Sequence, residues 1–95
     1  KLFLESSFDK LIATLESIDS QLELYQKRLI PELNKSSSAL SSQYGTGKID
    51  LIEVLSAKLE LQNSYISEEE LLEKKKLTTL LILEVTDSLV LSKEN

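Results

Sequence analysis

The chain has 95 residues, of which 41% are hydrophobic but only 5% aromatic, and its formal net charge is −5. A chain of this length forms at most one small domain, and its acidic balance argues against nucleic acid as a partner. Cys and His are absent. Disulfides, two common metal ligands and the usual thiol nucleophile and imidazole base are therefore excluded, and we expect no enzyme, cofactor or metal site.

Methionine is also absent, and the chain begins at Lys1. We therefore expect an excised segment of a longer protein or a processed product. No run approaches the ~18 uninterrupted apolar residues that a membrane-spanning helix needs, so we expect no direct membrane insertion of this segment.

The first half has the spacing of one long amphipathic helix, over about residues 2–43. Its apolar positions alternate steps of three and four, which is the spacing of a coiled-coil seam, and polar residues separate them. Leu4 extends this seam backwards by one step of four. The seam positions are Phe8, Leu11, Leu15, Ile18, Leu22, Tyr25 and Leu29.

The seam changes register near Pro31. The next apolar positions are Leu33, Leu40 and Tyr44, so a step of four follows Leu29 where a step of three is due. Such a stutter locally unwinds a left-handed supercoil. Proline also removes one helical hydrogen bond and clashes with the carbonyl four residues earlier. The helix either breaks and restarts here or continues with a bend, and the spacing that resumes afterwards favours the bend.

Residues 36–42 read SSSALSS, a composition that suits a linker as well as a helix. Leu40 lies seven residues beyond Leu33, and neither Gly nor Pro interrupts the segment. We therefore predict that the helix continues, with small side chains that let a neighbouring helix approach closely.

Both glycines of the chain fall within residues 44–50, where we expect a tight reversal. Gly45 and Gly47 can adopt the left-handed conformation that ends a helix. The Asp50 carboxylate can cap the next helix, with Glu53 reaching back as in a capping box. The sequence therefore predicts an all-α fold, a long antiparallel helical hairpin that forms a single domain over residues 1–95.

The second helix is expected over about residues 51–91 and carries two apolar stripes. Two stripes predict packing on two sides, in a larger bundle, a barrel of helices or an oligomer. For the hairpin alone, we expect a homodimer that forms an antiparallel four-helix bundle. One stripe holds Leu51, Val54, Leu61, Tyr65 and Leu72, and the other holds Ile52, Leu55, Leu59 and Ile66.

The end of this segment, residues 77–91, reads LTTLLILEVTDSLVL. Its β-branched residues would allow a strand of about five or six residues. No Gly or Pro separates it from the preceding helix, so we predict that the helix continues.

Two stretches carry a resemblance to a known family. Tyr44 and Gly47 match the pattern Y-x-x-G, and residues 54–57 then match VL-x-A. Upstream, residues 24–31 read LYQKRLIP and are similar to an LY-x-x-x-LLP stretch. In this order the patterns resemble the TolC-like outer-membrane efflux factors, especially their metal-efflux branch, over roughly residues 10–90.

The resemblance implies a place in a tripartite assembly for drug or metal export. In that family two such hairpins per subunit, in a homotrimer, form a hollow periplasmic α-helical barrel beneath an outer-membrane β-barrel. The chain would be a hairpin of that barrel, in the periplasmic portion of a Gram-negative outer-membrane protein. Its Y-x-x-G turn would meet the hairpin tip of a periplasmic adaptor that links it to an inner-membrane pump.

The resemblance assigns the adaptor-facing residues to the turn and to the start of the second helix. Lys58 departs from the Gln that the family often has after VL-x-A. The residues carried over are Tyr44, Gly45, Thr46, Gly47, Lys48, Ile49, Asp50, Leu51, Glu53 and Val54.

Three other interpretations remain. The glycines can simply permit a turn, with no partner involved. The chain can be the hairpin of an adaptor, although Arg28 lies some sixteen residues too early for the adaptor tip pattern. It can also be a stand-alone coiled coil that self-associates. A phosphate-binding loop is not expected, because residues 45–48 lack the GxxxxGK[ST] spacing and a preceding strand.

Overall fold

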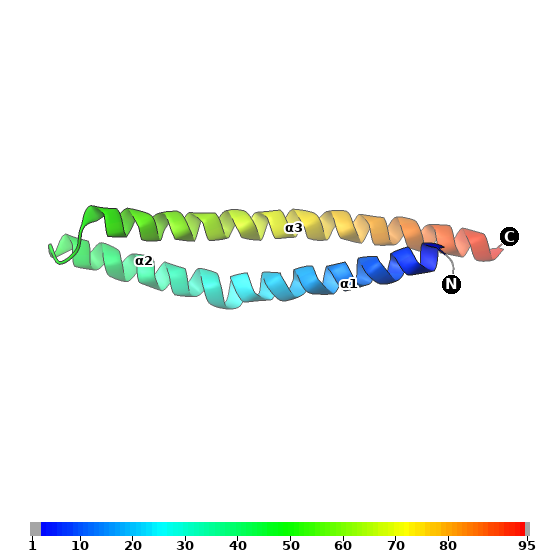
Figure 1. Cartoon of the computed structure of the whole chain (residues 1–95), viewed down its shortest axis with the longest axis horizontal. Helices are drawn as coiled ribbons and strands as arrows, with labels where there is room; N and C mark the ends of the chain where they lie inside the picture. Colours follow the sequence, from blue (N-terminus) through cyan, green and yellow to red (C-terminus); the bar gives the residue numbers. More distant parts are fainter. Residues whose placement is uncertain (1–2, 95) are drawn as a thin grey trace. The chain divides into compact units, whose positions relative to one another are not determined.

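A computed structural model describes residues 3–94 of the chain, and the side chains of residues 5–91. Every element in that range is helical, so the chain is an all-α helical hairpin, as predicted. The expected start of the first helix at residue 2 and the Leu4 side chain lie outside the described part. The elements are α1 (Phe3–Leu24), the π-helical turn η1 (Tyr25–Leu29), α2 (Ile30–Gly45) and α3 (Leu51–Glu94) (Figure 1).

By its internal contacts the chain divides into two compact units. One unit, Leu22–Glu70, holds η1, α2 and the first part of α3, which run antiparallel on either side of the turn. The other combines the chain up to Gln21 with the chain from Leu71 onward, so that α1 packs with the last part of α3. Residues 77–91 belong to α3, and the alternative of a short strand there is wrong.

The core of the Leu22–Glu70 unit is narrow, with a few large side chains and one small one. Leu22, Ile30 and Val54 are buried, and so is Ser37. Because Ser37 lies within α2, the Ser-rich segment is helix and not linker, as predicted. A small side chain at this inward position leaves room for the backbone of the neighbouring helix.

In the other unit the buried side chains are Ile18, Leu71 and Thr78. Lys75 lies between the last two along α3, and its Nζ is 2.8 Å from Oδ1 of Asp19 on α1. Both side chains of this ion pair are close to half exposed. Water therefore screens the attraction, and the pair contributes at most about 1 kcal/mol to stability.

The helix does not break at Pro31. The residues on both sides have helical backbone angles, so the alternative of a break and restart is wrong. Instead, η1 widens the turn just before the proline, and the Ile30 N–H donates to the Tyr25 carbonyl five residues earlier. A π turn inserts one extra residue into an α-helix. As a result Ile30 is buried, although the predicted seam passes through Leu29 and Leu33 and does not include Ile30.

The inward face of α3 differs from the first predicted stripe. Val54 and Leu61 turn inward, but Leu51, Tyr65 and Leu72 are exposed. The inward positions still alternate steps of three and four, yet several carry small, polar or charged residues that a search for large apolar side chains misses. They are Val54, Ala57, Leu61, Ser64 and Glu68 in one unit, and Leu71, Lys75, Thr78, Ile82, Val85 and Leu89 in the other.

The second predicted stripe lies wholly outside the hairpin seam. Ile52, Leu55, Leu59 and Ile66 are all exposed, and Ile52 retains 75% of its accessible surface. The prediction that α3 presents apolar residues on two sides is confirmed.

Leu22 and Leu24 of α1 are the same type of residue but differ in burial, so they test the assigned seam. Leu22 is 5% exposed and Leu24 is 44% exposed. We expect Leu22→Ala to lower the free energy of unfolding by about 2–3 kcal/mol, because it removes buried methyl groups and leaves a cavity. Leu24→Ala should cost less than about 1 kcal/mol, because that side chain buries little surface. Urea denaturation at one fixed protein concentration measures both, and equal losses would contradict the assigned seam.

Candidate functional site

The turn between α2 and α3 is closed by backbone hydrogen bonds. The Gly47 N–H donates to the Tyr44 carbonyl at 2.9 Å, and the Lys48 N–H donates to the Gln43 carbonyl at 3.0 Å. These two bonds form a Schellman motif, the arrangement that ends a helix on a left-handed residue. The Thr46 hydroxyl adds a bond of 2.9 Å to the same Gln43 carbonyl. The turn is thus a defined structure and not a loose loop.

The two glycines have different roles. Gly47 has φ +78°, a conformation that is unfavourable for a residue with a Cβ atom. Gly45 is the last residue of α2 and does not have positive φ, so the expectation that it adopts the left-handed conformation is wrong. A Cβ atom at either glycine would meet no heavy atom within 4 Å beyond its chain neighbours and its own helix. Both positions therefore face open space.

The start of α3 is capped differently from the prediction. The Glu53 N–H donates to the backbone carbonyl of Asp50 at 3.1 Å. Within the described turn, neither the Asp50 nor the Glu53 carboxylate makes a capping hydrogen bond. The carboxylates can still act at a distance, because negative charge near the first turn of a helix is favourable.

Most of the predicted site residues are accessible. Tyr44 to Lys48 are all exposed, as are Asp50, Leu51 and Glu53. Ile49 is half-buried. Val54 is buried in the core, so its side chain is not available to a partner. The structure therefore brings one continuous exposed surface together at the turn.

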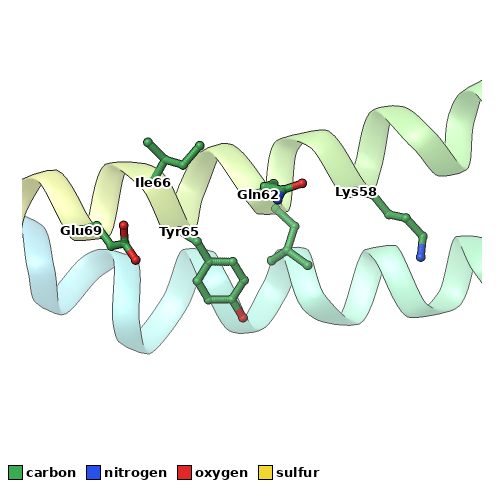
Figure 2. A pocket seen from close by; sticks show the side chains of 6 residues that line it. Lys58, Gln62, Tyr65, Ile66 and Glu69 are labelled. Carbon is green, nitrogen blue, oxygen red and sulfur yellow. The ribbon is translucent and has the colours of Figure 1, made fainter.

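A second surface lies along one side of α3. The predicted stripes included its apolar residues Leu61, Tyr65 and Ile66, but not the charged and polar residues beside them. We call this shallow hollow the α3 groove; Figure 2 shows its lining residues, with Ile66 projecting from the edge of α3 away from the neighbouring helix. The sequence signal for these residues is the spacing of Lys58, Gln62, Tyr65 and Glu69 by steps of four, three and four. The groove is lined by Lys58, Leu61, Gln62, Tyr65, Ile66 and Glu69.

In the range that the structure describes, no group of three or more His, Cys, Asp or Glu side chains is placed to hold a metal ion. Among the described helices, none combines the length and apolar character needed to cross a membrane.

Comparison with known proteins adds no relative to this description. The chain matches no protein-family model, no curated protein and no solved structure.

The two glycines provide a matched pair of variants. We expect Gly47→Ala to destabilise the chain by about 1 kcal/mol, because alanine must adopt the left-handed conformation. Gly45→Ala should leave the stability unchanged or raise it by up to about 1 kcal/mol, because alanine favours a helix and its Cβ meets open space. The denaturation midpoints at equal protein concentration measure both. A larger loss from Gly45→Ala than from Gly47→Ala would contradict the assigned roles.

Proposed function

We propose that this chain is an interaction module whose turn, residues 44–48, docks against the hairpin tip of a periplasmic adaptor. In this proposal it is a periplasmic hairpin of an outer-membrane efflux channel, part of a trimeric α-helical barrel that exports drugs or metals. The observation that carries the proposal is a turn whose residues 44–48 are all exposed and yet held by hydrogen bonds. The choice of partner rests on the resemblance of the Y-x-x-G and VL-x-A patterns to the efflux factors.

A fixed turn suits docking for an energetic reason. Association costs free energy when loops and side chains become ordered, and a turn already held by its own hydrogen bonds avoids much of that cost. Gly45 and Gly47 present backbone without side chains to the outside. Another helical tip can therefore approach closely, while the exposed Tyr44 and Lys48 side chains provide polar contacts at the edges.

The outer face of α3 supports the barrel half of the proposal. A helix in the wall of a barrel has neighbours on two sides, so it needs apolar residues on more than one face. Of the large hydrophobic side chains that are exposed in the described chain, all but Leu24 and Tyr44 belong to α3. Large exposed apolar patches are rare on monomeric soluble proteins and mark interaction surfaces.

The docking surface can be tested by adding bulk at the turn without straining it. Gly45→Trp places a large side chain on the last helical residue of α2, where a Cβ meets nothing within 4 Å. We expect at least about a tenfold loss of affinity, which is about 1.4 kcal/mol. Isothermal titration of the purified cognate adaptor hairpin into the chain measures this.

The matched control is Ala39→Trp, which adds the same side chain at an exposed position of α2, six residues before Gly45. It should leave adaptor affinity unchanged, and circular dichroism should show equal helix content in both variants. Unchanged affinity in Gly45→Trp, or equal losses in both variants, would refute docking through the turn.

A further inference from the structure

The α3 groove has a symmetry that the hairpin itself does not use. Its six lining residues pair off about the midpoint between Asn63 and Ser64. Lys58 and Glu69 carry opposite charges, and the Gln62 and Tyr65 side chains can form a hydrogen bond. The pairs are Lys58 with Glu69, Leu61 with Ile66, and Gln62 with Tyr65.

We propose that two copies of this chain associate through the α3 groove, with their α3 helices antiparallel and a two-fold axis between Asn63 and Ser64. A two-fold axis perpendicular to a helix brings each residue opposite its mirror position in the partner, which makes the interface self-complementary. Lys58 then lies opposite the partner's Glu69, and Gln62 lies opposite the partner's Tyr65.

The spacing of these positions suits helix pairing. Lys58, Gln62, Tyr65 and Glu69 follow one another by steps of four, three and four. This alternation keeps one strip of a helix turned toward a partner helix, as in a coiled coil. The four residues of the strip are all exposed and lie beside the inward face of α3, whereas Leu61, which also lines the groove, is one of the inward residues.

The charges select the antiparallel orientation. Lys58 and Glu69 are eleven residues apart, or about 16 Å along a helix that rises 1.5 Å per residue. An antiparallel pair makes two Lys–Glu contacts across the interface. A parallel pair in register would instead oppose Lys58 to Lys58 and Glu69 to Glu69, and like charges at such positions are unfavourable.

Apolar surface next to the strip supplies the driving force. Leu55, Leu59 and Ile66 are exposed, and Leu59 retains 60% of its accessible surface. In a symmetric dimer both copies contribute these three residues, so the interface removes apolar surface from water on both chains. At the centre, the Gln62 amide and the partner's Tyr65 hydroxyl can hydrogen-bond, which fixes the register as polar residues do in coiled coils.

The second copy is favoured as the occupant because the groove complements itself in charge. An unrelated helix would need the same order of lysine, glutamine, tyrosine and glutamate in reverse to match it equally well. The surface is also separate from residues 44–48, so self-association and docking through the turn can succeed or fail independently.

Charge reversal tests the pairing directly. Sedimentation equilibrium should show that the native chain dimerises in the micromolar range, and that Lys58→Glu or Glu69→Lys weakens the dimer at least about tenfold. In each variant, two like-charged pairs replace the two attractive ones. An equimolar mixture of the two variants should form a heterodimer, because position 58 of each chain then again faces a side chain of opposite charge at position 69 of the other.

The control is Lys35→Glu, which alters the net charge as much as Lys58→Glu does, at an exposed position of α2. It should dimerise like the native chain, with helix content by circular dichroism equal in all variants. A native chain that stays monomeric at a hundred micromolar, reversals that dimerise normally, or a mixture that fails to restore the dimer would each overturn the proposal. Binding of a different helical protein by a monomeric chain would also overturn it.

Discussion

The left-handed backbone of Gly47 is the constraint on which the hairpin depends. With this one residue at φ +78°, the Gly47 and Lys48 N–H groups can turn back to the last carbonyls of α2. The chain then leaves the helix in the direction that allows α3 to begin at Leu51 and pack antiparallel to α2. A side chain at this position would oppose that geometry, and the packing of every inward residue in the Leu22–Glu70 unit follows from it.

The apolar residues of α3 are not confined to its inward face. Its inward strip includes Ala57, Ser64, Glu68 and Thr78, whereas leucines and isoleucines crowd its outer side. Small inward residues allow close helix approach but bury little apolar area. Much of the hydrophobic free energy available to this chain is therefore realised only when another surface covers α3.

The two exposed surfaces are suited to different partners. The turn offers backbone and a few polar groups at the end of the hairpin, which favours end-on contact with another tip. The α3 groove offers a strip of alternating charge and apolar character along the side of a helix, which favours a second helix lying beside it. The two surfaces share no residues.

Sequence spacing was enough to place the helices, because the alternation of steps of three and four and the absence of internal Gly or Pro are local properties of the chain. It was also enough to place the reversal, since a positive φ requires a residue such as Gly47. Local patterns did not reveal the π turn before Pro31, in which the missing N–H of proline and the packing of Ile30 act together. They also assigned the cap to the Asp50 carboxylate, whereas the structure closes that turn through backbone atoms.

The sequence by itself determined the all-α hairpin, the place of its turn and the presence of apolar residues on two sides of the second helix. Only the tertiary structure decided which side of α3 faces inward. The reason is that inward positions are selected by how closely two helices can approach, so Ser37 and Ala57 can lie inside while Ile52 and Leu59 remain outside. Hydrophobicity alone would have placed Ile52 and Leu59 inside and Ser37 and Ala57 outside. The arrangement of charges along the α3 groove became visible only once the outer side of α3 was known.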